Sequence, residues 1–219
     1  MKFQALKNHI EGQVKNILCT AIKVDDVLES AVGQCRHAFS FSANKYFQKE
    51  EDYPSPFHSG KYMILLYYLS RQLFLKDGDG ERAEKIYYLN KILNGIDIFY
   101  EVALPAVWGG EHPLGSVMGR AVYGDRFFFF QGCTVGGSAS GDGYCYPEIG
   151  SGVLMYSNSK VLGKCSIGDN VIFSANSYVI NQNVPANSIV FGQGKDVVIK
   201  KMDMEKYISL TKQIWVADL

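Results

Sequence analysis

A six-residue repeat in the second half of the chain constrains its fold more than any other feature. Apolar residues recur there at intervals of six, and a small or β-branched residue follows most of them by four positions. The repeating residues are Ile149, Met155, Val161, Ile167, Phe173 and Val179, with an earlier run of Tyr123, Phe129 and Val135. A helix has a period of about 3.6 residues and an amphipathic strand a period of about 2, so neither produces this spacing. A period of six predicts a β-solenoid, in which each flat face of the coil takes six residues.

The composition of the repeat region agrees with a solenoid. Sixteen of the 22 glycines lie between Gly109 and Gly194, and only eight charged residues lie between Pro113 and Gly194. Glycine suits corners that need a positive φ, and a low charge suits coils that stack on one another. The repeat breaks between Val135 and Ile149, a gap of 14 residues that exceeds two faces by two. We therefore predict that a loop at residues 138–146 leaves the solenoid wall.

The first half of the chain predicts helices. Residues 1–48 carry apolar side chains at three- and four-residue spacing, 62–75 form an aromatic-rich apolar segment, and 81–94 end at Gly95. Residues 50–56 are charged, contain proline and predict a linker. The Asp77–Gly80 turn is not a calcium loop, because Arg82 and Tyr88 stand where such a loop needs glycine and glutamate. We expect an α-helical N-terminal domain (1–96), a parallel β-helix (97–198) and a C-terminal tail or short helix (199–219).

Charge and cysteine content exclude several classes of protein. The 22 basic and 22 acidic residues give a net charge of zero, so no basic surface for nucleic acid is indicated. No apolar run reaches the ~18 residues of a membrane span, and no secretory signal is visible. The five cysteines contain no CxxC pair, and Cys133 and Cys165 fall on inward solenoid positions. These features predict a cytoplasmic protein.

Four local motifs resemble the hexapeptide-repeat acyltransferases, and most closely the serine acetyltransferases. They are NGIDI (94–98), EHPLGSVMG (111–119), QGCTVGG (131–137) and NVPANSIVFG (183–192). The resemblance covers roughly residues 60–195 and implies a left-handed parallel β-helix. It also implies acetyl-CoA as the co-substrate and a homotrimer, which can pair through the helical domains as a dimer of trimers.

His112 is the candidate general base. It is the only histidine in the second half of the chain and lies where the solenoid begins. Acetyl transfer to a hydroxyl needs a base, and a histidine that titrates near neutrality suits that role. The resemblance assigns Asp97, 15 residues earlier, to orient the imidazole, and it places Glu111 on the substrate side. The alternative is that His112 only caps the start of the solenoid. A zinc site needs three histidines, so no metal is expected.

The resemblance also implies a groove for the cofactor. Thr134, Gly136 and Gly137 would place backbone amides against the acyl and pantetheine part, where glycine allows close approach. Ser174, Ala175 and Gly192 would continue this groove, and Lys195 would meet the phosphates. An ordinary solenoid corner and a solvated lysine are the alternatives.

The protruding loop departs from the family. Serine acetyltransferases carry an Arg-His pair before a proline there, and the arginine holds the carboxylate of the substrate. Here Cys145 and Tyr146 precede Pro147. A bidentate carboxylate partner is therefore missing, whereas tyrosine can stack on a sugar face. The acceptor stays open between serine, a related small molecule and a sugar hydroxyl.

Two further functions remain compatible with the sequence. One is N-acetyl transfer to an amino sugar, and the other is a non-catalytic solenoid scaffold. His58, in the helical half, is a candidate for lining the acceptor site, with a structural role as the alternative.

Overall fold

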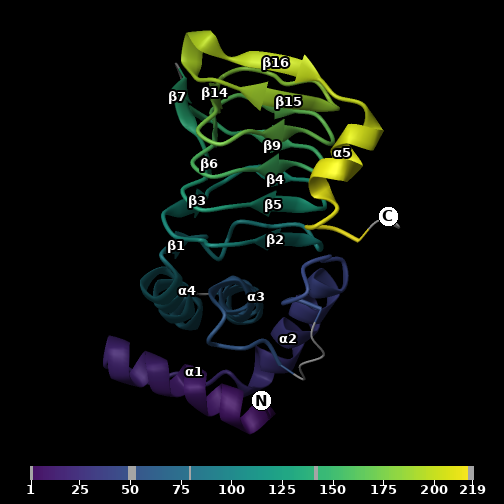
Figure 1. Ribbon diagram of the computed structural model, residues 1–219. Coiled ribbons are helices and arrows are strands. Elements are labelled where there is room, and N and C mark those ends of the chain that lie inside the picture. Colours follow the sequence, from purple (N-terminus) through teal and green to yellow (C-terminus); the bar gives the residue numbers. More distant parts are fainter. Residues whose placement is uncertain (1, 49–52, 79, 141–142, 217–219) are drawn as a thin grey trace.

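The computed structural model describes residues 2–48, 53–78, 80–140 and 143–216. Four helices form the N-terminal part: α1 (Phe3–Leu18), α2 (Asp25–Ser40), α3 (Ser59–Asp77) and α4 (Glu81–Asn94). They lie beneath the stacked strands in Figure 1. Helix α3 is almost wholly buried between residues 62 and 69, as its apolar sequence predicts. The predicted linker at 50–56 lies partly outside the described residues.

The expectation of helix throughout residues 1–48 is wrong at two places. Cys19 has a φ of 53° and ends α1 in the left-handed conformation. A new helix then begins at Asp25 and Asp26, whose negative charges favour a helix N-terminus. The helical conformation ends after Ser40, and the following segment turns back toward the strands. The predicted third helix matches α4, which Gly95 ends with a φ of 63°.

Three of the four sheets among the described residues stack to form the coils in the second half of the chain. The first sheet contains β1 (Ile96–Asp97), β3 (Ser116–Met118), β6 (Thr134–Gly136), β11 (Lys160–Leu162) and β14 (Tyr178–Ile180). The second sheet contains β2 (Trp108–Gly110), β5 (Phe127–Phe129), β10 (Leu154–Met155), β13 (Ile172–Phe173), β15 (Ser188–Phe191) and β16 (Val198–Lys201). The third sheet contains β4 (Val122–Tyr123), β9 (Glu148–Ile149) and β12 (Ser166–Ile167).

The chain visits these sheets in turn, and the strands pair in parallel. Leu154 pairs with Ile172, Lys160 with Tyr178 and Glu148 with Ser166, each a separation of 18 residues. Three faces of six residues account for this separation. The residues of the six-residue repeat are buried, and so are Cys133 and Cys165. The prediction of a helical region followed by stacked parallel strands is confirmed.

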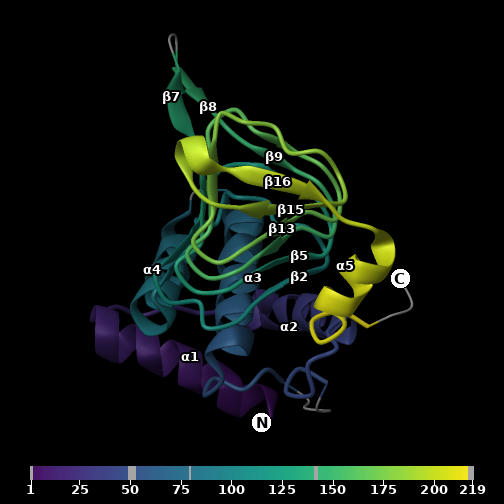
Figure 2. The same ribbon diagram turned by 45° about the horizontal axis from the view of Figure 1, so that its top comes forward.

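The predicted loop at 138–146 is an antiparallel hairpin. Strands β7 (Ser138–Ser140) and β8 (Gly143–Cys145) pair only with each other. Figure 2 shows the hairpin projecting away from the stacked coils. Residues 141 and 142, which separate the two strands in the sequence, lie outside the described part of the chain.

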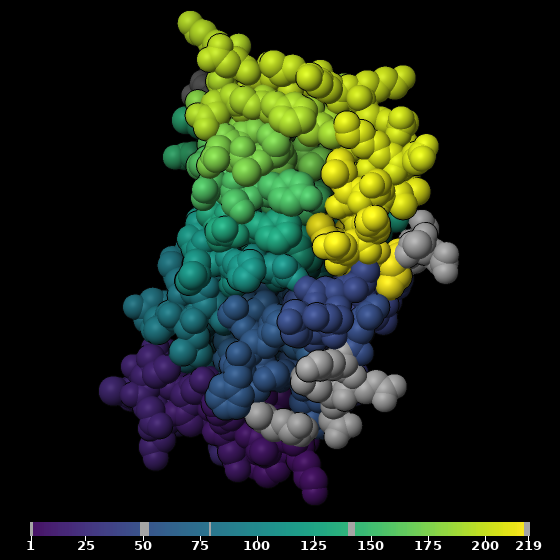
Figure 3. All heavy atoms as spheres, viewed as in Figure 1, coloured from purple at the N-terminus to yellow at the C-terminus, as the bar shows by residue number. Residues whose placement is uncertain are grey.

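The C-terminal segment folds back along the second sheet. Strand β16 runs antiparallel to β15, and α5 (Met204–Thr211) follows. In Figure 3 this segment, in yellow, descends to the residues that follow α2. It covers an outward column of Phe128, Leu154, Ile172 and Ile189, which are in register on successive strands. Met202, Tyr207, Ile214 and Trp215 complete this apolar cluster.

Among the described helices, none combines the length and apolarity that a membrane span needs.

Candidate active site

His112 lies at the corner between β2 of the second sheet and β3 of the first. Its side chain is exposed, and its φ of 52° is uncommon for a residue with a β-carbon. It lines a cavity of about 340 Å³ with Asn44, Tyr46, Phe57, His58, Ser59, Gly60 and Glu111. An exposed imidazole in the wall of a cavity is accessible to a substrate hydroxyl, which is what a general base needs.

Glu111 borders two cavities. Its carboxylate accepts a hydrogen bond from the side-chain amide of Asn44. Its backbone N–H donates to the carbonyl of Phe129 at 3.1 Å, which holds it at the end of the second sheet. Besides the cavity it shares with His112, Glu111 lines a larger one of about 670 Å³. The predicted substrate-side position of Glu111 is therefore next to His112 and open to a ligand.

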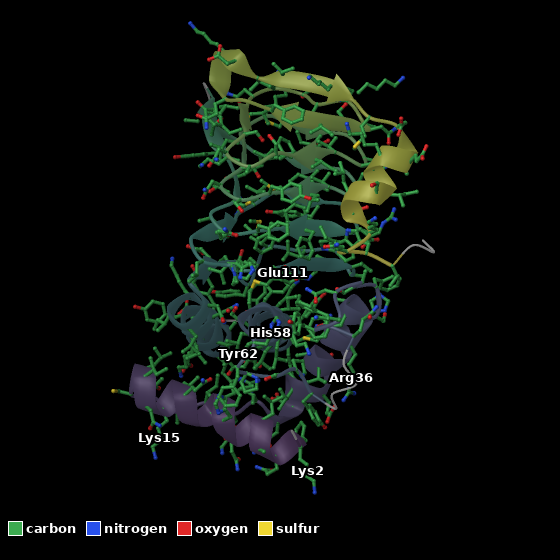
Figure 4. All side chains as sticks on the ribbon, in the orientation of Figure 1. Lys2, Lys15, Arg36, His58, Tyr62 and Glu111 are labelled. Carbon is green, nitrogen blue, oxygen red and sulfur yellow. The ribbon has the colours of Figure 1, made fainter. Side chains whose placement is uncertain are left out.

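His58 comes from the helical region but lines the same cavity as His112. Figure 4 shows His58 and Glu111 where the helices meet the first strands. The Nδ1 atom of His58 accepts the backbone N–H of Lys61 at 3.3 Å, so His58 caps α3. Glycine at position 60 lets the start of α3 lie close to β2, because a β-carbon there would lie 3.0 Å from the Gly110 carbonyl oxygen. His58 thus combines a structural role with a place at the cavity.

Asp97 lies apart from His112. Its carboxylate accepts hydrogen bonds from the Tyr87 hydroxyl at 2.7 Å and from the Lys91 ammonium at 2.6 Å. The bond to Asp97 raises the pKa of Lys91. Asp97 lines a different cavity of about 420 Å³, which also contains Arg120. No hydrogen bond or ion pair among the described residues joins Asp97 to His112, so the orienting role of Asp97 stays a prediction.

Tyr146 and Cys145 lie at the other edge of the first sheet from His112. The strands of this sheet run parallel, so they all begin on one side and end on the other. His112 lies on the side where β3 begins, and Tyr146 lies on the side where β6 ends. A β-carbon on Gly137 would come within 2.8 Å of the Tyr146 ring, so the ring covers this glycine. The Arg120 guanidinium lies 5.2 Å from the centre of the same ring. Within one chain, the predicted substrate residues therefore occupy two separate places.

The predicted cofactor residues divide between the same two corners. One column of equivalent positions in successive coils contains Glu111, Phe130, Tyr156 and Ser174. The backbone N–H of each of the first three donates to the carbonyl of the residue just before the next member of the column. Ala175 follows Ser174 in the same coil, and Gly192 lies level with it in the next coil. Gly136 ends β6, beside Gly137 and Tyr146, and Thr134 begins that strand. Lys195 is exposed in the short helix η1 (Gly194–Asp196).

Sequence reasoning missed four residues around Glu111. Asn44 and Lys212 come from distant segments, and only the tertiary structure brings them to this corner. Phe130 and Tyr156 stack with ring planes 2° apart and centroids 5.4 Å apart. They occupy equivalent positions one residue after the inward Phe129 and Met155, so the repeat itself contained the signal for this aromatic pair. Over the described residues, no group of His, Cys, Asp and Glu side chains suits a metal ion.

Comparison with known proteins finds similarity to serine acetyltransferases. The chain is 31% identical over 136 residues to a serine acetyltransferase of Staphylococcus epidermidis, which covers 62% of this chain and 63% of that protein. It is 35% identical over 111 residues to a serine acetyltransferase of Staphylococcus aureus, and the match covers 50% of this chain and 52% of that protein. The resemblance predicted from the sequence is confirmed. The chain matches less than two thirds of the length of these relatives, and no model of a protein family matches it.

Solved structures extend the similarity to the fold of nearly the whole chain. Serine acetyltransferase of Neisseria gonorrhoeae superimposes with a TM-score of 0.67 at 22% identity, covering 93% of this chain and 83% of that one. The same enzyme in complex with serine gives a TM-score of 0.60 at 26% identity, covering 84% and 71%. A serine acetyltransferase in complex with CoA gives 0.69 at 20% identity, covering 90% and 84%.

Proposed function

We propose that this chain is an acetyl-CoA-dependent O-acetyltransferase. The observation that carries the proposal is the exposed His112 imidazole in the wall of a cavity, at a corner that continues through Ser174 toward Gly192. Relatives named serine acetyltransferase support the reaction class, and a related structure in complex with CoA supports the cofactor.

The proposed reaction uses His112 as the base. The acceptor hydroxyl gives its proton to the imidazole while its oxygen attacks the thioester carbonyl carbon. The carbon–sulfur bond then breaks, and the imidazolium returns the proton to the leaving thiolate, so that CoA leaves as the thiol. Backbone amides near Gly136 would stabilise the oxyanion that forms in between. Asp97 would orient His112 in the assembled protein, which requires it to give up part of its bonding to Lys91.

We further propose a homotrimer with left-handed coils and domain boundaries near residues 96 and 198. The positions of His112 and Tyr146 at opposite edges of the first sheet support this assembly, because neighbouring copies can bring the two edges together. Val117 and Ile180, on the outer face of that sheet, are 38% and 48% exposed and supply apolar contact surface. Light scattering should give three times, or six times, the 24.4 kDa mass of the chain. A monomer at micromolar concentration would contradict the assembly.

The acceptor offers a hydroxyl group, and two observations favour a sugar over free serine. Cys145 and Tyr146 stand where the family has an Arg-His pair whose arginine holds the substrate carboxylate. Arg120, which lines the same cavity as Asp97, already lies over the Tyr146 ring. A charge-assisted contact contributes roughly 1.5–3 kcal/mol, so its loss weakens serine binding by about one to two decades.

The deciding experiment measures thiol release from acetyl-CoA with serine, sugars and amino sugars as acceptors. We expect turnover with at least one hydroxyl acceptor, and His112→Ala should nearly abolish it. Thiol release with amino sugars alone would replace O-transfer by N-transfer. No acceptor-dependent release, with a folded protein that binds acetyl-CoA, would remove the proposal. A serine KM below about 1 mM without turnover of any sugar would show that serine, and not a sugar, is the acceptor.

A further inference from the structure

The C-terminal segment after α5 is anchored on the second sheet by Trp215. The Trp215 side chain is 7% exposed and lies edge-on against Phe128, with ring centroids 5.7 Å apart and ring planes at 89°. It also reaches β2, because a β-carbon on Gly109 would come within 3.9 Å of the indole ring. Burial of a large aromatic side chain stabilises a contact strongly. Trp215 therefore holds this part of the segment against the coils.

The anchored segment pairs with the loop after α2. Ser42 and Trp215 form an antiparallel bridge. Two backbone N–H groups donate between the segments beside this bridge, from Ala43 to the Ile214 carbonyl at 2.9 Å and from Val216 to the Phe41 carbonyl at 3.0 Å. Among the described residues, the backbone of 41–43 bonds to no other segment outside α2 and the loop itself. The position of this loop therefore depends on the C-terminal segment.

Asn44 follows the paired loop and orients the carboxylate of Glu111. The side-chain oxygen of Asn44 accepts the Tyr46 backbone N–H at 2.9 Å, so its amide group faces the other way. That amide donates a hydrogen bond to the Glu111 carboxylate. No other side chain in the described part of the chain bonds to this carboxylate. Trp215, the loop and Asn44 thus form a continuous series of contacts that ends at Glu111.

The orientation of Glu111 matters because this residue precedes His112 and lines the same cavity. A carboxylate that is already held in one orientation can accept a hydrogen bond from a ligand without losing further rotamer freedom. Ordering the side chain in advance therefore lowers the entropy cost of binding. Trp215 is not among the described residues that line either cavity beside Glu111, so it can act on a ligand only through other residues.

We propose that Trp215 is a positioning residue for acceptor binding and acts through Asn44 on Glu111. The inference rests on the proposed function for the presence of an acceptor beside His112. It gives the C-terminal segment a part in acceptor affinity that the coil alone does not provide.

The test measures steady-state kinetics of the full-length protein with acetyl-CoA and with serine, glucose and glucosamine as acceptors. Trp215→Ala and Asn44→Ala should each raise the KM of the best acceptor about fivefold, while kcat and the acetyl-CoA KM stay within about twofold. Trp215→Phe should restore the KM, because it keeps an aromatic ring against Phe128. Ile208→Ala removes a 49% exposed apolar side chain from α5 and is the matched control.

The double variant tests the path between the two residues. If Trp215 acts through Asn44, the combined change raises the acceptor KM no more than either change alone, about fivefold, because the two effects are coupled. A rise of about 25-fold would show that the residues act independently and would overturn the inference. A rise in the acetyl-CoA KM as large as that in the acceptor KM would assign the segment to the cofactor groove and would also overturn it.

A backbone variant keeps the test informative if Trp215→Ala does not fold. Val216→Pro removes the N–H that donates to Phe41 and keeps the Trp215 side chain. Loss of this hydrogen bond should raise the acceptor KM about threefold. An unchanged acceptor KM in the folded variant would contradict the inference.

Hydrogen exchange separates this inference from the proposed function. If no acceptor is turned over, the proposed function fails, and amide exchange still tests the contacts. Trp215→Ala should speed exchange about tenfold at Ala43 and Tyr46, whose N–H groups bond within this series, and Ile208→Ala should not. Faster exchange at both positions would support the control of Asn44 by Trp215. Unchanged exchange at both would overturn it.

Discussion

The side-chain amide of Asn44 donates a hydrogen bond to the carboxylate of Glu111, the residue that precedes His112. The two residues are 67 positions apart in sequence. Asn44 is held in turn, because its side-chain oxygen accepts the Tyr46 backbone N–H at 2.9 Å and the preceding residue bonds to Ile214. The orientation of Glu111 therefore depends on the loop after α2 and on the C-terminal segment.

Asn44→Asp should impair use of the acceptor. The new carboxylate would face the carboxylate of Glu111, and two like charges in contact repel each other. The substitution also removes the amide group that donates the hydrogen bond to Glu111. We expect the acceptor KM to rise about tenfold, with a nearly unchanged acetyl-CoA KM. Steady-state kinetics check this, with Asn8→Asp on the exposed surface of α1 as the control. Equal kinetics for the two variants would show that the Asn44–Glu111 bond has no part in acceptor binding.

His112→Ala should reduce the rate of acetyl transfer by about 10²–10⁴. The side chain is exposed, so its removal should leave the melting temperature and acetyl-CoA binding nearly unchanged. Thiol release, thermal unfolding and cofactor titration measure these three quantities. His37→Ala, in α2, is the histidine control. Retention of more than about half of the activity would rule out the general-base role.

Asp97→Asn and Lys91→Met distinguish catalysis from structure. Both changes break the same ion pair, whose side chains are 31% and 46% exposed. An exposed pair of this kind contributes about 0–1 kcal/mol, so both variants should lose little stability. If Asp97 orients His112 in the assembled protein, only Asp97→Asn lowers kcat. Equal kcat values for the two variants would leave Asp97 with a structural role at the junction of the helices and the first sheet.

Arg82 should make stability depend on pH at the acidic end. It donates hydrogen bonds to Asp26 and Asp77 and so connects α2 with the end of α3. These bonds hold the pKa of both carboxyls below the usual range. A lowered folded-state pKa stabilises the fold above the unfolded pKa of about 3.9, and this stabilisation is lost as the pH falls through the folded-state value.

Arg82→Met should therefore lower the melting temperature by about 2–4 °C at pH 7. The difference from the unaltered protein should shrink as the pH falls below about 4, because the two carboxyls then take up protons in the unfolded chain before they do so in the folded protein. Lys206→Met, on the exposed side of α5, serves as the control. A difference that stays constant over this pH range would mean that Arg82 acts through packing and not through charge.

Much of the fold could be predicted because the repeat is a local property of the sequence. Each apolar residue at the six-residue interval must point inward when three flat faces close a coil, and Met155, Val161 and Phe173 are fully buried. The two additional residues between Val135 and Ile149 likewise predicted a loop that leaves the wall, since inward positions must stay in register, and the structure shows that this loop is a hairpin. Helix α4 agreed with its prediction because Gly95 ends it locally.

The sequence by itself determined the coil, the position of His112 at its corner and the excursion of the hairpin. Only the tertiary structure decided which outward side chains meet, because spacing along a chain places a residue on a coil without choosing its partner. The family resemblance predicted that Asp97, 15 residues before His112, orients its imidazole, whereas Asp97 bonds to Lys91 within the chain. The outward apolar column that contains Phe128 and Leu154 must likewise be buried by another segment, and the repeat did not predict which segment that is. Burial of Trp215 against that column brings the C-terminal segment to Glu111, and this long-range apolar contact shapes the second cavity.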